Sequence, residues 1–526
     1  MHSQARRSRQ AIALGACLVV GACSRSGRDA AARRDTSASE GAPNFVPSAK
    51  PAPKSSDLSD ADIRRAVIDE LFRGPHMRAG SVIVGCVDGI VELTGAVDNL
   101  LAKERAVAIA EGVKGVRSVS DRIRVEPVRR TDQDITKDVK DALLYDPATE
   151  SSQVVVTATE GAVRLTGTAA SWQERELAAR LARGVRGVRA VNNDISVNVF
   201  KQRTDPDIER DVESRLRWDN FVNDGLIQVA VHDGAVRLSG VVGSAAEKSE
   251  AYFASWVHGV RNVDSSGLRV EWWARDDDLR KQKYAPKTDA QIASAIKDAL
   301  LYDPRVNFFD VAVNVDQGIA KLSGEVSSLK AKLAAESLAQ HTVGVTRIEN
   351  QLTVKPTKPV SDSVLAKRIS ALFAASPVLD ASAIHAEVQN GKVTLTGRVA
   401  TQFERAEAAD VADGLGGVTS VSNNLQVVAP EVAFVWVPGV FRFGPYVEGW
   451  RSTALRPTQS DAAISRNIER ELEWSPAVDA AQVHIEVRDG KATLTGTVDS
   501  SRERQAAVES AYEGGAIAVD DQLKVS

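Results

Sequence analysis

Few residues in this sequence have the types and spacing of a catalytic or metal site. The 526 residues include three cysteines and seven histidines, and no Cys-x-x-Cys motif or Cys/His cluster joins them. The chain therefore offers no candidate ligand set for zinc. No recurrent Ser/His/Asp or paired-carboxylate arrangement appears in the sequence, which disfavours a hydrolase. We expect a non-catalytic protein that uses no metal and no cofactor.

One cysteine, Cys23, has a sequence context that favours chemical modification. Arginines precede an apolar run at residues 11–20, which is too short to span a bilayer and is typical of an export signal. The sequence Val20-Gly21-Ala22-Cys23 resembles the lipobox of bacterial lipoproteins. The resemblance implies a signal peptide at residues 1–22, cleavage before Cys23 and acylation of Cys23, for example with palmitate.

The residues after Cys23 favour a location and a tether. Ser24 and Arg25 follow the cysteine, and by resemblance to lipoproteins without Asp at this point the chain is expected at the outer membrane, with its folded part in the periplasm. Residues 23–56 are rich in Ser, Ala, Arg and Pro, which is typical of a disordered tether. Two alternatives stay open: an ordinary secretory signal cleaved near Ala22, and a competing lipobox match that ends at Cys17.

A second group of candidate residues could contact lipid rather than react. Tyr or Trp ends the first predicted helix of four repeats, and Arg215 and Arg217 flank one of these rings. Amphipathic rings are favourable at lipid headgroups, and nearby cations attract anionic lipid. Packing of each ring against its own sheet is the alternative. The candidates for membrane or partner contact are Tyr145, Trp218, Tyr302 and Trp474.

An aromatic-rich insert lies outside the repeats, at residues 431–458. It could be an exposed contact patch or a strap between the fifth and sixth repeats. Its candidate contact residues are Trp436, Phe441, Phe443 and Trp450.

Two sequence markers recur six times in register. The first is a Ser/Thr-Asp pair, which begins at Ser59 in the first copy, and the second is Leu-Thr/Ser-Gly, which ends at Gly95 in that copy. Both markers show the same five separations along the chain, so the chain contains six tandem repeats. We number them as modules 1 to 6, and their expected ranges are 57–127, 131–199, 203–273, 287–356, 360–430 and 459–526.

The local pattern within each copy predicts the order helix, strand, strand, helix, strand. The Ser/Thr is a suitable helix N-cap, and apolar residues with helical spacing follow it, such as Ile135, Val139 and Leu143. Alternating residues then flank a turn such as Asp88-Gly89, which predicts a hairpin. The fold class is α+β, with six αββαβ modules that each have a three-stranded mixed sheet and two helices on one face.

This pattern resembles the BON domain, which is found in periplasmic and envelope proteins of bacteria. The resemblance rests on the first-helix cap, on Leu93-Thr94-Gly95 and its equivalents, and on a Gly-Val pair before the last strand. Module 6 departs from it with Gly515-Ala516, and module 3 has Asn220 where the other modules have a helix-ending proline.

The remaining reactive residue types have structural explanations. Cys86 occupies a position that holds Ala or Val in the other modules, so we expect a small core residue and not a reactive thiol. His385 and His484 share one outward position of the first strand, so we expect surface residues and not ligands.

Net charge limits the class of partner. The net charge of the chain is −4, and that of the part from Cys23 onward is −7. A negative net charge argues against binding of nucleic acid. The BON resemblance implies an envelope lipoprotein that binds anionic phospholipid or envelope proteins and supports membrane integrity. The alternative is a periplasmic holdase-like chaperone or a protein-interaction scaffold. Neither the oligomeric state nor the identity of the partner follows from the sequence.

Overall fold

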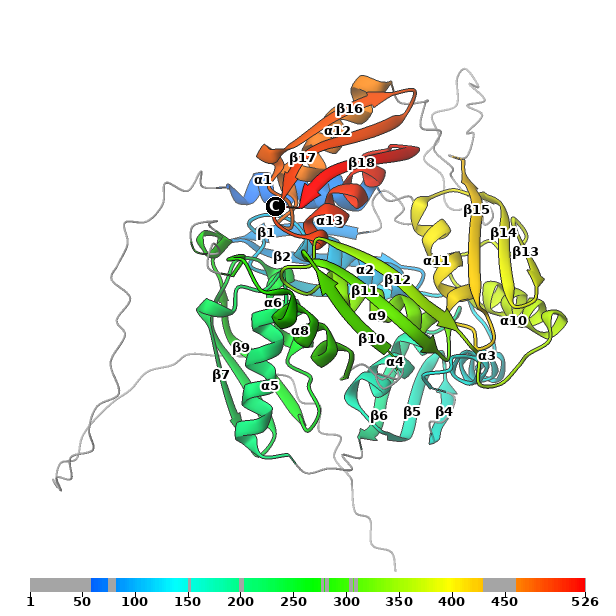
Figure 1. Ribbon diagram of the computed structural model, residues 1–526. Helices are drawn as coiled ribbons and strands as arrows, with labels where there is room; N and C mark the ends of the chain where they lie inside the picture. The colour runs from blue at the N-terminus through cyan, green and yellow to red at the C-terminus, as the bar shows by residue number, and fades with distance from the viewer. Residues whose placement is uncertain are drawn as a thin grey trace, which may run out of the picture. The chain divides into compact units, whose positions relative to one another are not determined.

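The computed structural model describes residues 58–73, 82–149, 153–197, 203–275, 279, 283–301, 306, 311–428 and 460–525. Six modules follow one another in these residues, and each has the predicted order helix, strand, strand, helix, strand. Figure 1 shows the helices of a module on one face of its three-stranded sheet. The predicted α+β class is confirmed.

The first helix of each module begins at the Asp of the Ser/Thr-Asp marker. Five of the six preceding Ser or Thr residues accept a hydrogen bond from a backbone N–H in the first turn, and Ser361 is the exception. Gln291 also accepts from Thr288 N at 3.0 Å, which completes the predicted capping box. These helices are α1 (Asp60–Arg73), α3 (Asp132–Tyr145), α5 (Asp205–Trp218), α8 (Asp289–Leu301), α10 (Asp362–Ala375) and α12 (Asp461–Trp474).

An antiparallel hairpin follows the first helix. Both residues of its two-residue turn have positive φ, as at Asp88 (52°) and Gly89 (71°), which is the geometry of a type I′ turn. The hairpins are β1 (Val82–Val87) with β2 (Ile90–Val97), β4 (Gln153–Thr159) with β5 (Ala162–Ala169), β7 (Ile227–His232) with β8 (Ala235–Val242), β10 (Val311–Asp316) with β11 (Ile319–Val326), β13 (Ile384–Gln389) with β14 (Lys392–Val399), and β16 (Val483–Arg488) with β17 (Lys491–Val498).

The Asp of the marker joins the first helix to this hairpin. In module 3, the Asp205 carboxylate accepts from the backbone N–H groups of Asp233 at 2.8 Å and Gly234 at 2.9 Å. The same pair of bonds is present in all six modules. In modules 1 and 3 these bonds hold the pKa of the aspartate, Asp60 or Asp205, below its usual value. The marker therefore recurs because its carboxylate fixes the turn.

The second marker recurs because its glycine lies against the neighbouring strand. Gly167 has φ 123°, and a Cβ atom on it would lie 1.9 Å from the carbonyl oxygen of Gln153. A side chain at this position would displace the partner strand.

A second helix and a last strand complete each module. The last strand pairs in parallel with the second strand of the hairpin, as predicted for a strand-helix-strand unit. The helices are α2 (Leu100–Glu111), α4 (Trp172–Arg183), α6 (Ala245–Ala254), α9 (Leu329–Gln340), α11 (Gln402–Asp413) and α13 (Ser501–Glu513). The last strands are β3 (Ser118–Val125), β6 (Ala190–Val197), β9 (Asn262–Val270), β12 (Arg347–Val354), β15 (Ser420–Val427) and β18 (Ala518–Val525).

Each module has its own hydrophobic core between the helix layer and the sheet. In module 2, Ile135, Val139 and Leu143 of α3 pack with Val163 and Leu165 of β5. Five other clusters of the same kind belong to the other modules. The strand residues of opposite phase point away from this core and are exposed or half-buried.

Candidate binding surfaces and module interfaces

The aromatic residue at the end of α5 contacts another module. Trp218 is half-buried and packs against the core of module 4. Its carbonyl oxygen accepts from Val343 N at 2.9 Å, and Asn220 N donates to the His341 carbonyl at 3.0 Å. The C-terminal carbonyls of a helix have no partner within the helix, so a donor from the neighbouring module is stabilising here.

The departure of module 3 from the repeat pattern has a reason at this interface. Asn220 stands where other modules have proline, and both its backbone N–H and its side-chain amide donate to module 4, the latter to the Gln340 carbonyl at 2.9 Å. Proline has no N–H and could not make the backbone bond.

Modules 2 and 5 are joined by the same kind of bond in both directions. Tyr145 of module 2 packs against the core of module 5, and its carbonyl accepts from Gly416 N at 2.9 Å. In return, Arg186 N of module 2 donates to the Ala375 carbonyl at the end of α10. The Arg186 guanidinium also donates to the Ser376 carbonyl at 2.8 and 3.0 Å. These two modules therefore contact each other through equivalent surfaces.

Modules 1 and 6 make the third contact of this type. Trp474 at the end of α12 packs against the core of module 1, and its carbonyl accepts from Lys114 N at 3.0 Å. The three contacts thus join the modules in a nested order, 1 with 6, 2 with 5 and 3 with 4. We call them the pairing contacts.

The pairing contacts correct the expected position of the candidate aromatic residues. Trp218, Trp474 and Tyr145 pack against the partner module, and not against their own sheet or at a free surface. On α5, which ends at Trp218, Arg215 is half-buried and Arg217 is exposed. The part of each ring that packs against the partner module cannot meet lipid headgroups, and the three rings are half-buried.

Several other candidate residues lie outside the described residues. They are Cys23, Tyr302, Trp436, Phe441, Phe443 and Trp450.

Modules 2 and 3 share an aromatic cluster that the sequence did not predict. Trp172 at the start of α4 stacks on Trp256, with ring centroids 4.3 Å apart and an angle of 7° between the planes. Tyr252 and Phe253 of α6 meet Trp172 edge-on or tilted, at 6.5 and 6.2 Å. Such ring pairs stabilise a contact beyond the area that they bury.

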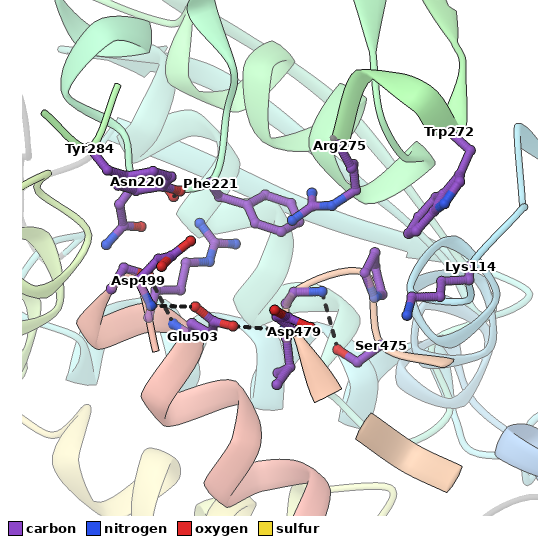
Figure 2. A pocket seen from close by; sticks show the side chains of 15 residues that line it. Lys114, Asn220, Phe221, Trp272, Arg275, Tyr284, Ser475, Asp479, Asp499 and Glu503 are labelled. Atoms are coloured by element: carbon purple, nitrogen blue, oxygen red, sulfur yellow. Dashed lines mark hydrogen bonds between the residues drawn. The ribbon is translucent and has the colours of Figure 1, made fainter. Parts of the chain in front are cut away.

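A polar cavity of about 180 Å³ lies where modules 1, 3 and 6 meet. Figure 2 shows Phe221 of module 3 and Arg275, which directly follows this module, across from Asp479 and Glu503 of module 6, with Lys114 of module 1 to one side. The Glu503 carboxylate accepts from Asp479 N and Asp499 N, both at 2.7 Å. Burial lowers the pKa of Lys114 and raises the pKa of Glu503.

Two guanidinium groups pack against the same ring at this cavity. The Cζ atoms of Arg275 and Arg502 lie 4.9 and 4.3 Å from the Phe221 ring centroid. The volume is below the roughly 300 Å³ of drug-sized ligand pockets, and its cations and acids are balanced. The cavity therefore serves as a polar junction between modules and is too small for an extended peptide.

The structure describes one cysteine, Cys86, and both histidines of the outward strand position. Cys86 packs against the core of module 1 and donates to an oxygen of Asp60 at 3.4 Å. Burial, followed by the Asp60 carboxylate, raises its pKa to about 11, so the thiol is protonated near neutral pH. His385 and His484 are exposed on the outward strand face, as the repeat pattern predicted.

One histidine lies within a pairing contact. Burial, followed by the Arg502 charge, lowers the pKa of His341 to about 4, so this ring is neutral at pH 7.

A cluster of three glutamates was not predicted from the sequence. Oxygens of Glu70, Glu471 and Glu513, from α1, α12 and α13, lie within 4.8 Å of one another at the contact of modules 1 and 6. Glu70 comes from module 1, and Glu471 and Glu513 come from module 6. The three carboxylates are therefore part of the interface between these two modules.

None of the helices in the described residues is long and apolar enough to cross a membrane.

Comparison with known proteins agrees with the repeat. A family model described as "BON domain" matches residues 59–127, 131–199, 204–271, 288–356, 361–429 and 460–526. "Osmotically-inducible protein Y" of Escherichia coli (strain K12) is 32% identical over 145 residues, which are 26% of this chain and 72% of that protein.

Solved structures give weaker likenesses. The C-terminal domain of CdsD, a structural protein of the type III secretion system of Chlamydia trachomatis, is matched over its whole length and 43% of this chain, with 16% identity and a TM-score of 0.12. The PrgH periplasmic domain is matched over 98% of its length and 39% of this chain, with 14% identity and a TM-score of 0.12.

Proposed function

Since this chain belongs to the BON-domain family through six matched segments, we propose that it is a non-catalytic protein of the bacterial envelope that acts in the response to envelope stress. The name of its Escherichia coli relative, "Osmotically-inducible protein Y", supports a stress-related role. Binding of anionic phospholipid, which supports membrane integrity, is the proposed activity. Acylation at Cys23 is the proposed means of attachment to the outer membrane.

One observation carries this proposal: the pairing contacts use the ends of the first helices and leave sheet faces exposed. Outward residues such as Ile83, Val155 and His484 are exposed. The molecule thus presents exposed faces on its sheets, and its junction cavity holds about 180 Å³. Exposed faces of this kind suit contact with a surface such as a membrane better than binding of a small substrate, which needs a concave pocket.

The reactive groups that the structure describes support the non-catalytic part of the proposal. The pKa of Cys86, raised to about 11, disfavours nucleophilic chemistry at neutral pH. The buried His341, with its pKa lowered to about 4, is a poor general base at pH 7.

Vesicle flotation tests the proposed activity. The chain from Ser24 onward, which carries no acyl group, should float with vesicles of phosphatidylethanolamine and phosphatidylglycerol, and less with vesicles of phosphatidylcholine alone. Absence of the protein from both floated fractions at low salt would reject lipid binding and favour a protein partner.

Cell fractionation tests the attachment. The full chain should be recovered with outer membranes and take up labelled palmitate, whereas the Cys23→Ser variant should take up none. Label that still enters the Cys23→Ser variant would move the modification to Cys17 or another site.

A further inference from the structure

The outward face of the module 1 hairpin carries three exposed aliphatic side chains. Ile83, Val87 and Ile90 are 64%, 68% and 48% exposed. Val87 pairs directly with Ile90 across the hairpin, and Ile83 lies further along the same strand, opposite Thr94. The three side chains therefore lie on one face of β1 and β2. We call them the module 1 outer face.

The other five modules provide an internal comparison for this face. Each has at most one Val, Ile or Leu at the three equivalent positions, and modules 4 to 6 have a charged residue among them. The equivalents of Ile83 are Val155, Gln228, Ala312, His385 and His484; those of Val87 are Thr159, His232, Asp316, Gln389 and Arg488; those of Ile90 are Ala162, Ala235, Ile319, Lys392 and Lys491. The fold does not require aliphatic side chains here, so their presence in module 1 calls for another cause.

The surroundings of the face are electrically balanced. Arg122 on β3 pairs with Glu92 on β2 at 2.8 Å, and Arg124 pairs with Glu126 at 3.5 Å. No strand in the described part of the chain pairs with the free edge of β1. A partner of this face is therefore held by apolar contact more than by net charge.

The position of module 1 in the chain indicates which partner that is. Module 1 begins at α1, directly after the segment that leads from Cys23. An acyl chain at Cys23 would hold this module closer to the bilayer, along the chain, than any other module. A tether raises the local concentration of a weak binding face at the surface to which it is attached.

We propose that the module 1 outer face docks on the phospholipid bilayer to which the chain is anchored. Ile83, Val87 and Ile90 enter the headgroup boundary, where apolar side chains leave water. This inference rests on the proposed function and assigns its contact to a sheet face instead of the helix-end aromatic residues.

The test compares matched substitutions in the chain from Ser24 onward. Ile83→Thr with Val87→Thr removes aliphatic surface while keeping β-branched side chains that suit a strand. Val155→Thr is the matched control, because Val155 is the equivalent of Ile83 in module 2 and is 58% exposed. We expect the double variant to partition about tenfold less into vesicles of phosphatidylethanolamine and phosphatidylglycerol, and the control to bind like the wild type.

The outcomes distinguish lipid binding by the chain from docking through the module 1 outer face. If the wild type floats and the double variant floats equally, the docking face is wrong and the proposed function stands. If the wild type does not float, lipid binding itself is rejected. If flotation is unchanged and sedimentation shows that only the double variant has lost self-association, the face binds a second copy of the chain and the inference is overturned. Circular dichroism of the double variant and of the control checks that the fold is retained. Ile90→Thr is a second variant of the same face and should also bind vesicles more weakly.

Discussion

The carboxylate of Asp205 joins the start of α5 to the turn between β7 and β8 through two backbone hydrogen bonds. A type I′ turn needs positive φ at both central residues, and in modules 2 and 4 non-glycine residues of unfavourable type, Glu160 and Gln317, adopt it at 49° and 50°. The same aspartate bonds are present at these turns. The carboxylate thus stabilises a turn conformation whose own sequence is suboptimal.

Replacement of this aspartate should destabilise its module. We expect Asp205→Asn to lower the midpoint of the first thermal unfolding transition by a few degrees, because an amide accepts fewer hydrogen bonds than a carboxylate and places N–H groups toward N–H donors. Glu213→Gln, on the exposed side of the same helix, is the control and should leave the midpoint unchanged.

The pH dependence of this effect has a definite sign. The folded-state pKa of Asp205 is lowered, first by the bond from Gly234 and then by that from Asp233. Its stabilisation is therefore fully present above the unfolded-state pKa and is lost as the pH falls through the folded-state pKa. The difference between wild type and Asp205→Asn should shrink as the pH is lowered below about 4. A difference that grows in acid would contradict the assigned role.

The helix caps could be predicted from the sequence, whereas the pair of bonds from each marker aspartate to its hairpin turn, which we call the aspartate clamp, could not. The Ser/Thr hydroxyl was predicted to cap the first helix, and five of six do so. The aspartate clamp joins residues 28 and 29 positions apart, and the marker alone did not indicate this contact. The second helices also carry a Ser/Thr-x-x-Glu signature, as at Ser244 and Glu247. Glu247 N donates to the Ser244 hydroxyl, and the Glu247 carboxylate accepts from Gly243 N, one residue before the N-cap.

At the scale of elements, helix ends form the pairing contacts. The amphipathic pattern predicted that each first helix has a buried face, and the cores confirm this for Ile208, Val212 and Leu216. The pattern did not indicate that Trp218 packs on a different module, because its partner Val343 is far away in sequence. The spacing of apolar residues predicts that one face of a helix is buried, but it does not indicate which segment covers that face.

Removal of the ring should weaken one pairing contact. We expect Trp218→Ala to cost about 2 kcal/mol of stability, since the ring is half-buried and a fully buried Trp costs more. Hydrogen exchange should become faster at Val343 N and Asn220 N, whose bonds cross the contact. Trp273→Ala is the control, because Trp273 is 41% exposed. Unchanged exchange at both amides, with weaker vesicle binding instead, would restore the lipid role of Trp218.

In the whole molecule, six similar modules pair in nested order. All six modules belong to one compact unit. The repeat count and the fold of each module were accessible from sequence because they depend on local patterns. The order of pairing was not, because it depends on which helix ends meet: Lys114 with Trp474, Gly416 with Tyr145, and Val343 with Trp218.

The nested order is tested most directly by comparing two four-module chains of similar length in thermal unfolding with a dye that binds exposed apolar surface. Residues 131–429 contain modules 2 to 5 and keep two complete pairs, whereas residues 59–356 contain modules 1 to 4 and keep one. We expect 131–429 to unfold cooperatively near the temperature of the full chain with little dye bound. We expect 59–356 to bind more dye and to show an additional transition at lower temperature. Equal behaviour of the two chains would contradict the nested pairing.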